Sequence, residues 1–233
     1  MTGELLVVVP ARGGSKRIPR KNILPLLGQP LLLYTLNAAR EAGLGPATWV
    51  STDDAEIAAV TRAAGMQVLP RQQANAQDRS STESVLLEAL DFVAEKHGWQ
   101  PELVLTLPPT SPLRRATTIA AFVQRFRELP GHYDAMHTLT ETRDDLWLWD
   151  GEPAIRRLFP DAPRRRQERQ PVFVENSCMY ITRVSVLRAC GFILGKRAAG
   201  FPIEAVEGVD INEPEDLAWV EFLLRQRAQE RPA

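Results

Sequence analysis

Short apolar runs alternate with amphipathic segments along most of the chain. Unbroken valine- and leucine-rich runs are typical of strands buried on both faces of a parallel sheet. Apolar residues spaced three and four apart predict helices instead. The pattern predicts strands at 5–10, 48–51, 67–69, 103–107, 135–140 and 171–182, and helices at 30–42, 55–64, 80–97, 116–129 and 217–229. The repeated strand–helix unit predicts an α/β fold with a doubly wound, mostly parallel sheet.

Residues that begin and end helices support this assignment. Pro30 suits the first turn of a helix, and Gly43 suits the position after its end. Asp53 and Asp54 supply cap-type side chains before the helix at 55–64. These signals predict where the helices of the first half of the chain begin and end.

The alternation breaks between residues 142 and 171. This stretch contains Trp147, Trp149, several prolines and the run Arg164–Arg166. An insertion with exposed aromatic residues is either a subunit contact or an ordinary surface arm, and the pattern leaves both open. No internal repeat or second domain is evident. We therefore predict one domain over residues 1–233 with an inserted arm at about 142–171.

Composition and charge exclude several classes of protein. The formal net charge is −1, so no global charge attracts polyanions, and no nucleic-acid partner is expected. No apolar run is long enough to span a bilayer, so no membrane partner is expected either. Cys178 and Cys190 cannot form a disulfide framework, which favours a reducing, cytoplasmic compartment.

A basic loop follows the first strand directly. Arg12, Lys16, Arg17, Arg20 and Lys21 surround the pair Gly13-Gly14. Ligands of open α/β sheets bind beyond the carboxyl ends of strands, and glycines leave backbone N–H groups accessible to phosphate oxygens. Basic runs are commonly solvated surfaces or nucleic-acid contacts, but this one lies between two apolar segments of the fold. It matches neither GxxxxGK[ST] nor GxGxxG, so it predicts a triphosphate loop of a different kind.

A second polar cluster lies near the C-terminal end, at residues 209–216. In an extended segment Asp210 and Asn212 share one face. A carboxylate and an amide carbonyl are suitable ligands for a Mg²⁺ ion that also holds triphosphate oxygens. Asn212 equally reads as the cap of a helix with acids in its first turn. Asp210 is the stronger metal-ligand candidate, and both roles stay open for Asn212.

Two weaker motifs carry hydroxyl and amide groups. Thr110 and Ser111 lie on a proline-stiffened turn after the strand at 103–107, where they offer hydrogen bonds or cap the next helix. Residues 175–180 lead into the last predicted strand with polar side chains. Cys178 within them is expected to be a buried, unreactive thiol, because the pattern places no histidine beside it.

Six segments taken in order, PARGGSKRIPRKN, STDD, LPPTSPLR, RRRQ, ENSCMY and VDINEPED, resemble the acylneuraminate cytidylyltransferase (CMP-N-acetylneuraminic acid synthetase) family. The resemblance runs from about Val7 to Asp216. It implies a Rossmann-like α/β domain with a small dimerisation arm, which corresponds to residues 142–171. It also implies a homodimeric, Mg²⁺-dependent enzyme that transfers CMP from CTP to an acidic sugar.

The resemblance assigns roles to particular residues. Those implied to act in catalysis are Arg12, Lys16, Lys21 and Asp210. The implied nucleotide-binding residues are Arg12, Gly13, Gly14, Ser15, Lys16, Lys21, Asn22, Arg71, Ala76 and Ser80. The implied sugar-binding residues are Thr110, Ser111, Arg166, Gln167, Asn176 and Tyr180, and the implied metal ligands are Asp210 and Asn212. Arg165 or Arg166 of the arm is expected to reach the sugar pocket of the partner subunit.

Three positions depart from the family pattern. Asn212 replaces a metal-binding aspartate, Pro108 replaces a glutamine that contacts the sugar, and Ser177 replaces a glycine. The triphosphate loop is intact, so nucleotide transfer is better supported than the identity of the acceptor. The alternatives are transfer to a deoxy-octulosonate, another nonulosonate or a phosphonate, or CTP binding without catalysis.

Overall fold

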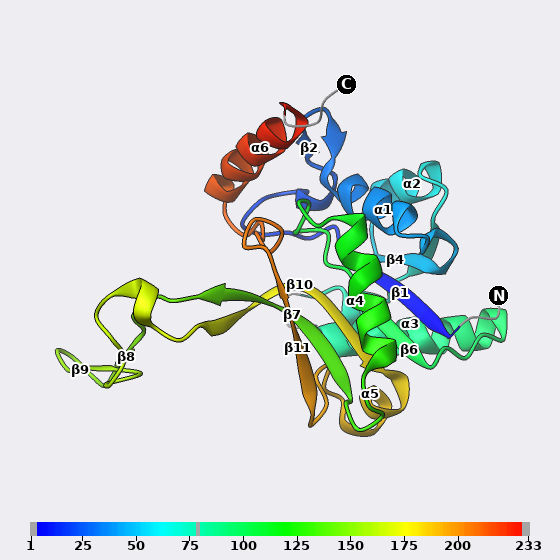
Figure 1. Ribbon diagram of the computed structural model, residues 1–233. Coiled ribbons are helices and arrows are strands. Elements are labelled where there is room, and N and C mark those ends of the chain that lie inside the picture. The colour runs from blue at the N-terminus through cyan, green and yellow to red at the C-terminus, as the bar shows by residue number, and fades with distance from the viewer. Residues whose placement is uncertain (1–3, 78–79, 230–233) are drawn as a thin grey trace.

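The computed structural model describes residues 4–77 and 80–229, and a twisted sheet of seven strands runs through its centre (Figure 1). The strand order is β11-β7-β10-β6-β1-β4-β5. The bounds are β1 Leu5–Pro10, β4 Thr48–Thr52, β5 Gln67–Pro70, β6 Leu103–Thr106, β7 Ala135–Thr142, β10 Val172–Arg183 and β11 Ala198–Ile203. Strand β10 runs antiparallel to both β6 and β7, and the other neighbours are parallel. This confirms the predicted mostly parallel α/β fold.

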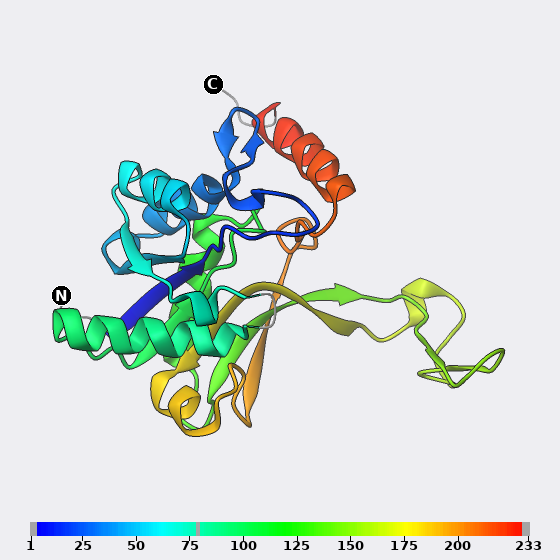
Figure 2. The ribbon, with the colours of Figure 1, turned by 180° about the vertical axis from the view of Figure 1, so that it is seen from behind.

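Helices cover both faces of the sheet (Figures 1 and 2). Their bounds are α1 Leu31–Glu41, α2 Ala55–Ala63, α3 Thr82–His97, α4 Ala116–Glu128, α5 Val184–Cys190 and α6 Pro214–Gln229. Val7 and Val9 of β1 pack in one buried cluster with α1, α2 and α4, whereas Leu6 and Val8 pack in another with α3 and α5. Strand β1 is therefore buried on both faces, as its unbroken apolar run predicts.

A third apolar cluster lies beyond the carboxyl edge of the sheet. It joins Ile18 of the basic loop to Leu26, Ile211 and Val220. Leu26 belongs to the short hairpin β2 (Pro25–Leu26) and β3 (Gln29–Pro30), and Val220 belongs to α6. This cluster holds the basic loop against the C-terminal helix, so residues from both ends of the chain meet above β1.

The predicted elements are all found, with ends that differ by a few residues. Helix α3 begins at Thr82 because Ser81 caps it, accepting a hydrogen bond from the Ser84 N–H at 3.1 Å. Helix α5 and strand β11 were not predicted. The sequence of β11, AAGFPI, has weak strand propensity. Its proline is tolerated because β11 is the edge strand of the sheet.

Residues 142–171 project from the body as a long arm (Figures 1 and 2). Strands β7 and β10 continue into it as a two-stranded ribbon, with Thr142 paired to Val172. The tip holds the hairpin β8 (Trp147–Trp149) and β9 (Ile155–Arg157) and the short helix η4 (Arg166–Glu168). Across the described parts of the chain, no helix has the length and apolarity needed to cross a membrane.

Candidate active site

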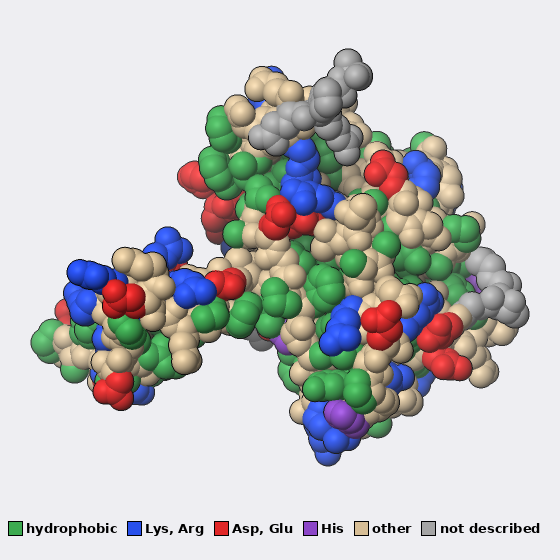
Figure 3. Space-filling view, in the orientation of Figure 1, with side chains coloured by type: hydrophobic (Ala, Val, Ile, Leu, Met, Phe, Trp, Pro, Cys, Tyr) green, Lys and Arg blue, Asp and Glu red, His purple; other side chains and the backbone are tan. Residues whose placement is uncertain are grey.

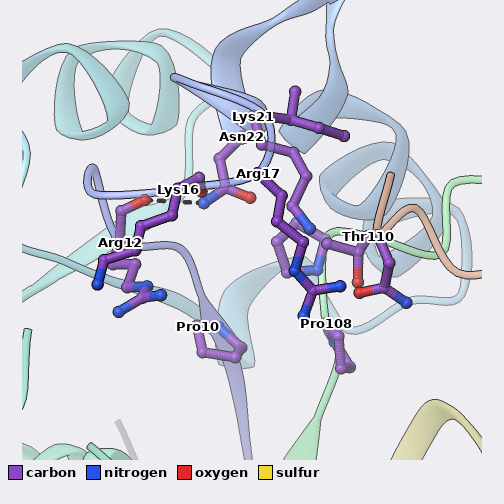
Figure 4. Close-up of a pocket in the computed structure, with 12 residues that line it drawn as sticks. Pro10, Arg12, Lys16, Arg17, Lys21, Asn22, Pro108 and Thr110 are labelled. Carbon is purple, nitrogen blue, oxygen red and sulfur yellow. Dashed lines mark hydrogen bonds between the residues drawn. The ribbon is translucent and has the colours of Figure 1, made fainter. Parts of the chain in front are cut away.

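A cavity of about 500 Å³ opens at the carboxyl edge of the sheet, beyond β1 and β6 (Figure 4). In Figure 4, Arg17 and Lys21 extend toward Thr110 and Pro108 from the loop after β1. The lining residues are Pro10, Arg12, Ser15, Lys16, Arg17, Ile18, Lys21, Asn22, Pro108, Pro109, Thr110 and Asn212. Three motifs far apart in the sequence thus meet at the position where ligands of open α/β sheets bind.

Two acids that follow β4 fix the backbone of the basic loop. The Gly13 N–H donates to Asp53 Oδ1 at 3.0 Å. Asp54 caps α2 by accepting from the N–H groups of Glu56 and Ile57, and it also pairs with Arg20. A Cβ atom at Gly13 would lie 2.6 Å from Asp54 Oδ2, so only glycine fits there. Asp54 was predicted to cap α2, and it has this second role as well.

Asn22 closes the loop from its far end. Its Nδ2 donates to the Arg12 carbonyl at 2.9 Å, the dashed line in Figure 4, and the residue is 5% exposed. Among the described residues, Asn22 Oδ1 is buried and has no hydrogen-bond partner. A buried acceptor of this kind is costly to leave unpaired, so it suits a hydroxyl donor from a ligand in the cavity.

Lys21 connects the basic loop to the segment around Asp210. Its Nζ donates to the Ile211 carbonyl at 2.7 Å, and the Ile211 N–H donates to the Thr110 carbonyl at 2.9 Å. Burial lowers the pKa of Lys21, although the negative charge of Asp210 opposes that shift. The ammonium group therefore lies in a partly desolvated site, where its charge acts more strongly on a bound anion.

The two candidate metal ligands contact each other. Asn212 Nδ2 donates to Asp210 Oδ2 at 2.7 Å. Asp216, in the first turn of α6, accepts at its Oδ2 from the N–H groups of Asn212 and Glu213, the two residues before the helix. The described residues contain no group of three or more His, Cys, Asp or Glu side chains that could hold a metal. One carboxylate and one amide suit a Mg²⁺ ion that arrives with a triphosphate and keeps phosphate and water ligands.

The remaining predicted nucleotide-binding residues lie in a neighbouring loop and do not line the cavity. Arg71 follows β5, and its guanidinium donates to Ser51 Oγ and to the Ser51 carbonyl, both at 3.0 Å. Burial lowers the pKa of Arg71, and the nearby charge of Asp53 opposes the shift. Ala76 ends the 3-10 turn Gln73–Asn75, and Ser80 Oγ donates to the Ala74 carbonyl at 3.3 Å. Gly14 lies instead in the basic loop after β1, where a Cβ atom would meet nothing within 4 Å.

Asn176 holds a bulge in β10. Its Oδ1 accepts from Thr138 Oγ1 at 2.6 Å and from the Cys178 N–H at 3.1 Å, and its Nδ2 donates to Thr140 Oγ1 at 2.9 Å. Ser177, the next residue, has φ 56°, in the left-handed region that favours glycine. Asn176 thus has several hydrogen bonds within the protein, and Cys178 is buried and free, as expected.

Tyr180 lies on the sheet beside His137. The two rings stack with centroids 6.4 Å apart and an interplanar angle of 15°, and the Tyr180 hydroxyl donates to Glu175 Oε1. Burial, followed by the bond to Glu175, raises the pKa of Tyr180, so this phenol stays protonated. Thr110 lines the cavity, whereas Ser111 is fully buried below it.

Arg166 and Gln167 lie on the arm and do not line the cavity of their own chain. They line a separate hollow with Glu141, Thr142 and Arg143, and Arg166 pairs with Asp144 at 3.6 Å. The sequence placed Arg17 in the basic loop but gave it no binding role of its own; it lines the cavity and pairs with Glu213 at 2.8 Å. Prediction from the sequence did not single out the buried Arg114, because SPLR reads as an ordinary turn before a helix.

Parallel strands that end at a cation-lined cavity, with a glycine loop after the first strand, define an α/β protein suited to binding a polyphosphate. Over residues 6–146 the chain matches the family described as Cytidylyltransferase, and it belongs to that family. This confirms the family predicted from the motifs.

Curated relatives and a solved structure agree with this assignment. The chain is 27% identical to N-acylneuraminate cytidylyltransferase A of Danio rerio over 93% of its length and 49% of the relative's. It is 33% identical to pseudaminic acid cytidylyltransferase of Campylobacter jejuni over 52% of each chain. It thus spans about half the length of these relatives. A CMP:2-keto-3-deoxy-manno-octonic acid synthetase complexed with CTP shares its fold, with a TM-score of 0.69, 19% identity and coverage of 97% of this chain and 100% of that one.

Proposed function

We propose that the protein transfers CMP from CTP to the anomeric hydroxyl of an acidic, sialic-acid-like nonulosonic sugar and releases pyrophosphate. The observation that carries the proposal is the cavity, where Arg12, Lys16, Arg17 and Lys21 gather at the carboxyl edge of the sheet in a chain of the cytidylyltransferase family. The sialic acid and pseudaminic acid named for its relatives support an acidic sugar as acceptor.

In this reaction the anomeric hydroxyl releases its proton to solvent, and its oxygen forms a bond to the α-phosphorus while the bond from that phosphorus to pyrophosphate breaks. Arg12, Lys16 and Lys21 stabilise the charge that develops on the pyrophosphate, and Gly13, Gly14 and Ser15 shape the loop around it. The cavity accelerates the step mainly by holding both reactants in line. Asn22 Oδ1 accepts a hydroxyl of the bound nucleotide, and Arg71, Ala76 and Ser80 lie in the loop we assign to its base.

Asp210 and Asn212 are the residues that would hold Mg²⁺. When bound, the ion supplies charge neutralisation at the phosphate oxygens. On the acceptor side we assign Thr110, Ser111 and Tyr180 to the sugar pocket, with Asn176 shaping the bulge beside it. At this pair the partner of Asp210 is the amide of Asn212 and not a second carboxylate. One carboxylate attracts the ion less strongly than two, which supports a second candidate, a CTP-binding protein without catalysis.

We further propose that the chain is a single domain whose arm contacts a second copy. Trp147, Trp149 and Ile155 are 48%, 70% and 53% exposed at the tip of the arm, an apolar surface suited to an interface. Figure 3 shows hydrophobic side chains (green) among Lys and Arg side chains (blue) on the arm. In a homodimer, Arg166 and Gln167, with Arg165 beside them, would complete the sugar pocket of the partner. We place the enzyme in the cytoplasm, where the exposed thiol of Cys190 stays reduced.

The interface is tested by Trp149→Ser, with Phe222→Ser on α6 as the matched control. Both residues are exposed aromatics, but only Trp149 lies on the arm. Light scattering should show a shift of Trp149→Ser toward the monomer mass, whereas Phe222→Ser should match the unaltered protein. Equal masses for all three proteins at one concentration would contradict the proposed interface.

The activity is tested by pyrophosphate release with CTP and Mg²⁺ against a panel of acceptors. The panel contains N-acetylneuraminate, other nonulosonates, a deoxy-octulosonate and a phosphonate, with ATP, GTP and UTP as controls. Release with CTP and a nonulosonate supports the proposal. A preference for the deoxy-octulosonate or the phosphonate would show that the acceptor belongs to that class and not to the nonulosonates. Tight CTP binding with no release for any acceptor would establish the second candidate instead.

A further inference from the structure

A buried guanidinium lies beneath the cavity, at the end of the turn that follows β6. Arg114 is 3% exposed. Its Nη2 donates to the Pro108 carbonyl at 3.0 Å and to Thr35 Oγ1 at 2.8 Å, and its Nη1 donates to the Cys178 carbonyl. These acceptors are neutral, and burial lowers the pKa of Arg114, although the nearby charges of Glu207 and Asp210 oppose the shift. A buried cation among neutral acceptors is costly, so its position calls for a physical reason.

The two carbonyls belong to two segments beside the proposed acceptor pocket. Pro108 begins the proline-stiffened turn that lines the cavity. Cys178 lies within the bulge of β10, between Glu175 and Tyr180. One planar side chain with two Nη atoms in fixed geometry therefore joins the turn to the bulge.

Further hydrogen bonds extend from each segment to the groups that the proposed reaction uses. The Thr110 carbonyl in the turn accepts from the Ile211 N–H, and the Ile211 carbonyl accepts from Lys21 Nζ. The turn thus helps to place Lys21 and the residues on either side of Ile211. On the other side, the bulge sets the start of the regular pairing that puts Tyr180 opposite His137.

We propose that Arg114 is a positioning residue, which fixes the separation between the turn after β6 and the bulge of β10 and so the shape of the proposed acceptor pocket. This rests on the function proposed above. Arg114 lies below the turn and acts through the Pro108 and Cys178 carbonyls. Since a shift of about 1 Å in a reacting group can cost roughly 10²-fold in rate, the fork geometry of the side chain matters more than its charge.

The test is Arg114→Lys, which keeps the charge and loses the fork, with Arg115→Lys as the matched control. Arg115 is adjacent in sequence, but its side chain is 44% exposed and pairs with Glu204 at the surface. We expect Arg114→Lys to bind CTP within about threefold of the unaltered protein, while kcat falls roughly 10²-fold and the KM for the acceptor rises. Arg115→Lys should leave all three quantities unchanged.

The pattern of loss distinguishes positioning from general structural damage. Unchanged kcat and acceptor KM in a folded Arg114→Lys protein would overturn the proposal, and so would equal losses in CTP and acceptor binding. If that variant does not fold, Thr35→Val removes one acceptor of the guanidinium at nearly constant volume. Thr35→Val should then show a smaller fall in kcat and a smaller rise in acceptor KM than expected for Arg114→Lys. Unchanged kcat and KM in Thr35→Val would also overturn the positioning role.

Hydrogen exchange provides a readout that needs no turnover. Peptides covering residues 107–113 and 176–182 should exchange faster in Arg114→Lys than in Arg115→Lys, and equal exchange would refute the bridge between them. The unaltered protein is assayed first with the acceptor panel. No pyrophosphate release by the unaltered protein with any acceptor counts against the proposed function. If the unaltered protein and Arg114→Lys release pyrophosphate at the same rate, the result counts only against the positioning role.

Discussion

The chain has two arginine-rich segments, the loop at residues 12–21 and the arm at 142–171. They differ in what their basic side chains contact. In the loop, the side chains of Arg12, Lys16, Arg17 and Lys21 line the cavity. In the arm, the guanidinium groups of Arg157 and Arg169 turn onto the arm itself. Arg157 donates to both carboxylate oxygens of Asp145, at 2.6 and 3.0 Å, and Arg169 donates to Asp145 at 3.3 Å.

The difference lies in what the neighbouring acids bind. Asp53 accepts from the loop backbone at Gly13, so it fixes the path of the chain. Asp145 contacts the cations directly, and Arg157 also donates to the Ala162 carbonyl at 2.6 Å. The loop therefore presents charge to a ligand, whereas the arm uses charge to hold a shape where little apolar core is available.

Lys21→Ala tests whether the cations of the loop act on the ligand, and we expect it to have the largest effect. It removes a desolvated cation from the cavity and its bond to Ile211, and kcat/KM should fall about 10²–10³-fold, as for the loss of another charge-stabilising donor. Lys96→Ala, in the exposed last turn of α3, is the control. Steady-state pyrophosphate release measures both, and normal turnover in Lys21→Ala would remove its assigned role.

Asn212→Asp makes the cavity more like the arm by adding a carboxylate beside the loop. Two carboxylates should bind Mg²⁺ more tightly than one carboxylate and an amide, because affinity rises with ligand charge. We expect the Mg²⁺ concentration for half-maximal rate to fall roughly tenfold, measured by metal titration at saturating CTP. Glu213→Gln is the control for altered charge nearby. An unchanged or higher Mg²⁺ concentration for half-maximal rate would show that residue 212 does not face the ion.

Asp145→Asn removes the acceptor that gathers the arm's arginines. The arm should open more often, so limited proteolysis within residues 142–171 should be several-fold faster, while CTP affinity stays the same. Asp150→Asn, which disturbs the exposed pair with Arg156 at 2.7 Å, is the matched control. Loss of CTP binding in Asp145→Asn would contradict the separation between the two segments.

The smallest effect is one of pH. The hydrogen bond from Arg157 holds the pKa of Asp145 below its model-compound value of 3.8. The contribution of Asp145 to arm stability is therefore complete above the unfolded value and is lost as the pH falls through the lower, folded value. Fluorescence of Trp147 and Trp149 should report this change only below about pH 3.8, and Asp145→Asn should lack it. An arm transition near neutral pH would contradict this account.

The sequence predicted the parts of this molecule that depend on local signals. Strand β1, the cap of α2 at Asp54 and the glycine loop follow from residues close together in the chain, and the structure contains them. Strand β11 was missed, because its register depends on β7 and little on its own residues. Similarly, the direction of β10 is fixed by its two neighbours, and no signal in its residues indicates it.

Long-range hydrogen bonds account for most of what was missed in the site. Arg114 and Cys178 are 64 residues apart, and Gly13 and Asp53 are 40 apart. No spacing rule connects such pairs. Asn212 illustrates the same limit, because its residue type alone did not show that its amide donates to Asp210 while its backbone N–H donates to Asp216.

Strand β10 constrains how this protein can diversify. It begins at the base of the arm with Val172 and carries the bulge at Ser177 and then Tyr180. Side chains of a strand alternate between faces, so a single inserted or deleted residue between the arm and Tyr180 would reverse the faces on one side of the change. Residues can be gained or lost at the tip of the arm without this effect. A change of chain length at the tip therefore leaves the faces of β10 intact, whereas the part of β10 that carries Tyr180 can change only by substitution in place.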